Sequence, residues 1–110
     1  MRQALKLNVH GETQVVDLDA PIGSLKVLQD AVGGWVEAVD LSETLTMWCN
    51  EEGKINGDIL NAKANQIFRD TFGAVDVIMG DVIFTGGADD EGDTMGLTDA
   101  QVNSLLQAVK

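Results

Sequence analysis

The stretch WVEAVDLSETLTMWC, from Trp35 to Cys49, predicts a β-hairpin. Its two apolar-rich strands, 35–41 and 44–49, turn at residues 40–43, a loop of a common hairpin length. If the loop closes there, Trp35 faces Trp48 across the two strands. The other face then carries the more uniformly apolar set, and we expect that face to point into the core. Its residues are Val36, Ala38, Leu45, Met47 and Cys49.

The segments before this hairpin predict a second hairpin and a helix. Residues Ala4–Val9 alternate between apolar and polar side chains, and Gln14–Leu18 follow after a turn-forming HGET. Between the two hairpins, residues 22–32 carry apolar side chains near helical spacing. Gly33 or Gly34 can then take the left-handed conformation that ends a helix.

The segments after the hairpin predict helix, strand and helix. Asn61 is the expected N-cap of a helix that ends at Gly73. The run Asp81–Gly87 is nearly continuous in apolar residues, as in a strand that is buried on both faces. Thr98 and Gln101 have the spacing of a capping box at the start of the last helix.

The predicted fold class is therefore α+β, in the order ββαββαβα. A chain of 110 residues with 45% hydrophobic residues suits one core, so we expect a single small acidic domain over residues 1–110. We expect one mostly antiparallel sheet with helices packed against it.

The charge and the sequence ends limit the class of partner and the compartment. A net charge of −11 opposes direct binding to nucleic acid or to an anionic membrane, and favours a protein partner with a basic surface. A single cysteine excludes an intramolecular disulfide, and neither a signal peptide nor a membrane span is predicted. We expect a cytoplasmic protein; its oligomeric state is left open, and a homodimer is compatible with the sequence.

Residues that could perform chemistry do not form a recognisable catalytic or metal-binding pattern. Cys49 shares its predicted strand face with apolar residues, and the only histidine, His10, lies in a distant turn. One histidine and one cysteine are too few for a zinc site. The acidic loop Gly86–Gly96 lacks the ligand spacing of an EF-hand, and no lysine follows its glycines as in a P-loop. We therefore expect neither an enzyme nor a cofactor.

Two features are candidates for binding, each with a structural alternative. Trp35 and Trp48 either pack under a helix or form a partner surface, where tryptophan is enriched. The following NEEGK supplies Glu51, Glu52 and Lys54 as a charged rim, or is simply a solvated turn. All five residues are kept as candidate binding residues.

Four strings together resemble a known family: GGWVEAVDL, MWCNEEGKINGDILNAKAN, DVIMGDVIFTGG and GLTDAQVNSLL. They are similar to the domain of unknown function numbered 3846, a family common in bacteriophage genomes. The resemblance spans about Lys6 to Leu106 and implies a phage accessory context. It supplies no catalytic or ligand-binding residues for transfer.

These observations favour a non-enzymatic phage-type accessory protein that binds a host or phage protein, in a host-takeover or anti-defence role. If the protein is phage-encoded, it would act in the cytoplasm of the host cell. One alternative is a small-ligand binder, such as a sponge for a nucleotide signal. Another is an acidic mimic of nucleic acid.

Overall fold

The computed structural model describes residues 2–53 and 59–110, and it has the predicted α+β order ββαββαβα. Five strands form one sheet in the order β2-β1-β5-β4-β3, and all neighbouring strands are antiparallel. The strands are β1 (Gln3–Leu7), β2 (Thr13–Asp17), β3 (Val36–Ser42), β4 (Leu45–Asn50) and β5 (Val82–Thr85). The helices are α1 (Ser24–Val32), α2 (Ala62–Phe72) and α3 (Asp99–Ala108).

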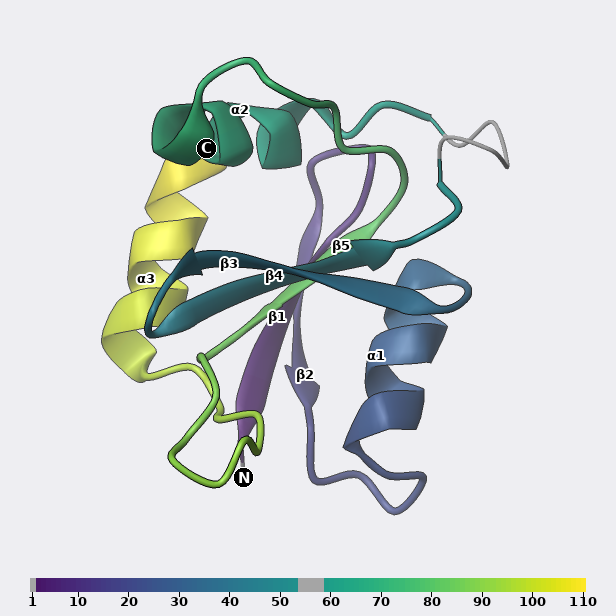
Figure 1. Cartoon of the computed structure of the whole chain (residues 1–110), viewed down its shortest axis with the longest axis vertical. Coiled ribbons are helices and arrows are strands. Elements are labelled where there is room, and N and C mark those ends of the chain that lie inside the picture. Colours follow the sequence, from purple (N-terminus) through teal and green to yellow (C-terminus); the bar gives the residue numbers. More distant parts are fainter. Residues whose placement is uncertain (1, 54–58) are drawn as a thin grey trace.

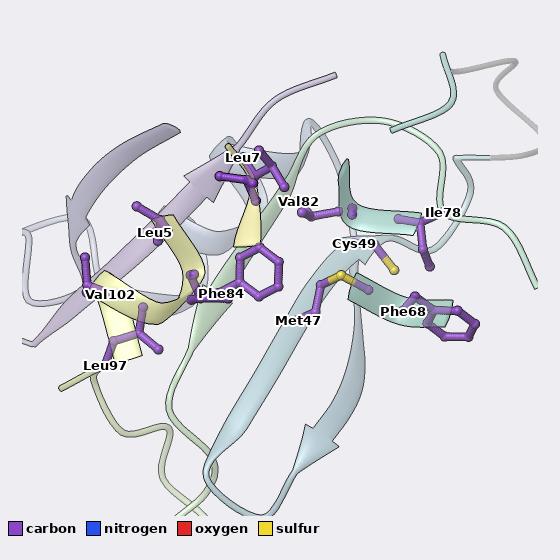
Figure 2. Packing of buried hydrophobic residues seen from close by; sticks show 13 residues of the cluster. Leu5, Leu7, Met47, Cys49, Phe68, Ile78, Val82, Phe84, Leu97 and Val102 are labelled. Carbon is purple, nitrogen blue, oxygen red and sulfur yellow. The ribbon is translucent and has the colours of Figure 1, made fainter. Parts of the chain in front are cut away.

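Helices cover both faces of the sheet: α1 lies on one side, and α2 and α3 lie on the other (Figure 1). The larger cluster joins strand residues such as Leu5, Met47 and Phe84 to Phe68 of α2 and Val102 of α3, as Figure 2 shows. The smaller cluster places Ile83 against α1. Below, the larger cluster is called the α2/α3 cluster and the smaller one the α1 cluster. Strand β5 contributes to both clusters and is buried at every position, which confirms the prediction for this run.

The register of the β3–β4 hairpin differs from the predicted one. Val39 pairs with Met47 and Ala38 pairs with Trp48, and the register shifts between Asp40 and Ser42 before a tight turn. The prediction that Trp35 faces Trp48 is therefore wrong. The predicted core face is also divided, because Val36 and Ala38 lie on the α1 side of the sheet.

Leu45, Met47 and Cys49 lie on the α2/α3 side. The reason for the error is that both faces of this sheet are covered. An apolar residue could therefore belong to either face, and the pattern alone did not fix the register.

The helix boundaries follow the predicted capping residues. The Asn61 side chain accepts the N–H of Ala64, and Gly33 ends α1 with φ 78° and ψ 24°. Thr98 and Gln101 form the complete capping box of α3. These local signals depend on nearest neighbours in the chain, so the sequence was sufficient to place them.

Two buried asparagines fasten the segment before β5 to helix α2. The Asn65 amide donates to the carbonyls of Asn61 and Ile78, and its oxygen accepts the N–H of Ile78. Asn61 Nδ2 donates to the carbonyls of Leu7 and Gly80. The asparagines of the NAKAN run thus satisfy buried backbone groups. Within the described residues, no helix is long and apolar enough to cross a membrane.

Candidate functional site

The β3–β4 hairpin is an acidic surface at one edge of the sheet. Between Val36 and Gly53 the sequence carries five carboxylates and no lysine or arginine. The carboxylates are Glu37, Asp40, Glu43, Glu51 and Glu52. All five residues are exposed, and β3 is the last strand of the sheet. We call residues 35–53 the acidic hairpin.

One end of the acidic hairpin combines an exposed indole with two carboxylates. Trp35 is 66% exposed, and its carbonyl accepts the N–H of Glu51 at 3.0 Å. The neighbouring N–H of Glu52 donates to Asn50 Oδ1 at 2.8 Å. The structure therefore places Trp35, Glu51 and Glu52 at the same end of the hairpin, although not through the predicted pairing of Trp35 with Trp48. Lys54 lies outside the described residues.

The turn after β4 is held to helix α1 by one side chain. Asn50 Nδ2 donates to the carbonyl of Val32 at 3.3 Å, while Asn50 Oδ1 accepts from Glu52. Trp35 also borders an open depression of about 490 Å³ at the C-terminal end of α1, beside Gln29 and Asp30. The backbone at this end is thus fixed by hydrogen bonds, while the Trp35 side chain remains on the surface.

The Trp48 side chain is packed and hydrogen-bonded inside the fold. It is partly buried against the α1 cluster, and its indole N–H donates to Thr85 Oγ1 at 2.8 Å. The sequence allowed the tryptophans either to pack under a helix or to lie on the surface. Trp48 packs at helix α1, and Trp35 lies on the surface. The structure does not bring them together as a pair.

The other end of the acidic hairpin borders an open groove of about 810 Å³. Asp40, Ser42, Glu43 and Thr44 contribute from the hairpin, and Gln101 contributes from α3. Gln101 Nε2 donates to the carbonyl of Thr44 at 2.7 Å, so the turn is tied to the capping box. The sequence analysis did not single out Asp40 or Glu43. The signal that could have identified them is that residues 36–53 contain five acidic residues and no lysine or arginine.

The floor of this groove requires glycine. A Cβ built on Gly87 would lie 2.1 Å from the carbonyl oxygen of Glu43, and one on Gly86 would lie 2.6 Å from that of Gly96. The two glycines therefore permit close approach of backbones.

The acidic loop next to this groove is held in a turn by hydrogen bonds between Asp89 and the backbone of the same loop. Asp89 Oδ1 accepts the N–H groups of Glu91 and Asp93 at 2.9 Å, and its N–H donates to the carbonyl of Asp93. Figure 1 shows this loop beside the N-terminus, where Arg2 Nη1 donates to the carbonyl of Thr94. The first loop aspartate therefore has a turn-forming role.

Arg2 also makes the best-defined ion pair of the described residues. Its backbone N–H and its Nε each lie 2.7 Å from an oxygen of Asp19. These hydrogen bonds, the backbone one first, lower the pKa of Asp19 below its usual 3.8. The pair joins the N-terminus to the chain after β2, away from the acidic hairpin.

The groups that could perform chemistry are dispersed. Cys49 is buried in the α2/α3 cluster (Figure 2), while His10 is exposed in the β1–β2 turn. Within residues 2–53 and 59–110, no three His, Cys, Asp or Glu side chains converge in a way that could hold a metal ion. The exposed groups that the fold gathers at the acidic hairpin are one indole and five carboxylates.

Comparison with known proteins identifies one family. A family model described as "Domain of unknown function (DUF3846)" matches residues 1–110. No curated protein and no solved structure matches the chain.

Proposed function

The chain belongs to the DUF3846 family, and from that premise we propose that it is a non-enzymatic binding domain whose acidic hairpin binds a basic surface of a host or phage protein. The observation that carries the proposal is the set of five exposed carboxylates on the acidic hairpin, which has no lysine or arginine between residues 36 and 53. Two of them, Glu51 and Glu52, lie at the same end as the exposed Trp35. An aromatic centre with a charged border is typical of protein interfaces. The phage accessory role, with host takeover or anti-defence as its purpose, is part of this proposal.

Charge complementarity supports a basic partner. Carboxylates on one surface attract lysine and arginine over several ångströms, and this attraction speeds association and weakens with salt. Trp35 can add a cation–π contact to an arginine or lysine of the partner. The surface thus has a source of both steering and short-range affinity.

The geometry is less favourable to a nucleotide sponge. Such a site needs stacking aromatics and basic groups at one pocket, and Trp35 and Trp48 were the available aromatic pair. The structure places Trp48 against the α1 cluster with its N–H bonded to Thr85. A single exposed indole among carboxylates suits a cation better than a phosphate.

The proposal is tested by capture with two charge variants of equal size. The immobilised protein is exposed to lysate of the bacterial host at low and moderate salt, and captured proteins are quantified by mass spectrometry. Glu51→Gln with Glu52→Gln removes two carboxylates beside Trp35, while Asp90→Asn with Glu91→Gln removes two exposed carboxylates from the acidic loop.

We expect capture of a basic protein that is strongest at low salt and lost in the hairpin variant but retained in the loop variant. Equal loss in both variants would indicate attraction by net charge alone and would contradict the proposed surface. Capture of nothing at either salt concentration would contradict the proposed function.

A further inference from the structure

Within residues 2–53 and 59–110, strand β3 is paired with β4 on one side and with no strand on the other. Glu51 N–H donates to the carbonyl of Trp35, and the same register continues through Val36 with Asn50 and Glu37 with Cys49. In an antiparallel pair, residues that exchange hydrogen bonds alternate with residues whose backbone groups point away. The backbone groups of Val36, Ala38 and Asp40 therefore point away from β4, at the outer edge of the sheet.

Strand β3 carries acidic side chains and one register shift at its edge, but no lysine or proline. Edge strands often carry lysine or proline, or are covered by another element. The β3 sequence VEAVDLS has neither residue type, and Glu37, Ala38 and Asp40 are exposed. The register shift near Ser42 interrupts the strand only at its end, next to the turn.

We propose that the outer edge of β3 accepts an extended, lysine- or arginine-rich segment of the partner protein as a sixth strand of the sheet. The proposal rests on the proposed function and specifies how that binding occurs. Backbone hydrogen bonds to residues 36, 38 and 40 would supply affinity, as in other cases of strand addition. Glu37 and Asp40, on opposite faces of β3, would select basic side chains on either face of the incoming strand.

A second copy of this chain is a poorer occupant. Each β3 strand carries Glu37 and Asp40 and no lysine or arginine, so pairing two β3 strands would gather the carboxylates of both copies at one interface with no base to balance them. Like charges brought together at a strand pair destabilise it. The other edge strand, β2, is also less suited to a basic segment because Lys6 lies beside it, paired with Gln14.

The direct test uses a defined probe on the full chain. The probe is an acetylated peptide of about nine residues in which lysine alternates with threonine and valine, a length that spans an edge strand. Amide hydrogen exchange is followed by NMR with and without the peptide at low salt. We expect exchange at Val36, Ala38 and Asp40 to slow by about tenfold or more, while the β2 amides keep their rates.

One substitution removes a backbone donor of β3 and keeps its charges, and a second substitution at the same position is its control. Ala38→Pro deletes an outward N–H at a position where an edge strand tolerates proline, and Ala38→Ser is its control. If Ala38→Pro fails to fold, the same test is made on the wild-type protein with a peptide methylated at alternate backbone nitrogens. We expect either change to weaken peptide binding by about tenfold or more, whereas Ala38→Ser binds like the wild type.

Several results would overturn the proposed strand addition. These are equal binding of the methylated peptide, peptide binding without slowed exchange at the three amides, or no peptide binding at low salt. If exchange at the three amides becomes slower as the protein concentration rises, without any peptide, the edge of β3 pairs with a second copy of the chain. If partner capture still depends on Glu51 and Glu52 in these cases, the proposed function stands and its strand-addition mechanism fails.

Discussion

The two tryptophans differ in what surrounds each indole. Trp48 packs against the α1 cluster and donates to Thr85, whereas Trp35 is 66% exposed. Tryptophan buries a large apolar area when it is covered, and it binds partners well when it is not. The same residue type therefore contributes to stability at position 48 and is available for recognition at position 35.

Trp48→Ala should destabilise the fold by about 3 kcal/mol, because it removes a partly buried aromatic side chain and its hydrogen bond. Trp48→Phe should cost less, since the ring remains. Urea unfolding of both variants measures the difference. A loss of stability below about 0.5 kcal/mol for the alanine variant would show that Trp48 is not part of the core.

Asp19 should make the stability of the fold depend on acid pH. Its pKa is lowered in the folded state by hydrogen bonds from Arg2, so its contribution is present above the unfolded value of 3.8. That contribution is lost as the pH falls through the lower folded pKa.

The urea midpoints of the wild type and Asp19→Asn should therefore differ by a constant amount above about pH 5 and converge below pH 3.8. Comparison of the two proteins cancels the titration of the other carboxylates. A difference that is unchanged at low pH would contradict the assigned ion pair.

Among the helices and strands, the helix caps could be predicted from the sequence, whereas the register of the β3–β4 pair could not. The caps at Asn61 and Thr98 depend on residues within one helical turn, so the sequence placed the starts of α2 and α3 correctly. The β3–β4 register depends on which face of the sheet is buried. Because helices cover both faces, Val36 and Met47 are both apolar although they lie on opposite sides.

Thr98→Ala should destabilise the fold by about 1 kcal/mol, because the threonine hydroxyl accepts the N–H of Gln101 in the capping box. Thr98→Ser should retain most of the stability, since serine keeps the hydroxyl. Chemical denaturation compares the two variants. An unchanged midpoint for Thr98→Ala would mean that the capping bond contributes nothing measurable.

Gly87→Ala should destabilise the packing of the β3–β4 turn against the segment after β5. The added methyl group would lie 2.1 Å from the Glu43 carbonyl oxygen, so a backbone segment must shift. We expect a cost of about 2–3 kcal/mol. Ala88→Ser, a change at an exposed neighbour, should stay within about 0.5 kcal/mol.

Thermal or urea unfolding of the pair decides this prediction. Similar stability of Gly87→Ala and Ala88→Ser would contradict the close approach. The result also bears on the groove, because the same contact positions Asp40 and Glu43 at its border.

At the scale of the molecule, the candidate site was predictable only in part. The sequence identified Trp35, Glu51 and Glu52, which the fold gathers at one end of the acidic hairpin. It could not assign Trp48 to the α1 cluster, because α1 and β4 are separate in the chain and come into contact only in the folded structure. Nor could it show that β3 is an edge strand, since strand order is a long-range property.

In the proposed function, recognition occurs at the acidic hairpin while the two hydrophobic clusters stabilise the fold. Trp35 separates these roles most clearly, because it lies in the proposed recognition surface and outside both clusters. Its replacement should therefore affect binding without affecting stability.

The most direct measurement is capture of the basic partner by Trp35→Ala, with the unfolding free energy determined on the same preparation. We expect stability within about 0.5 kcal/mol of the wild type together with loss of most of the capture. Capture equal to that of the wild type by a stably folded Trp35→Ala protein would contradict the proposed surface.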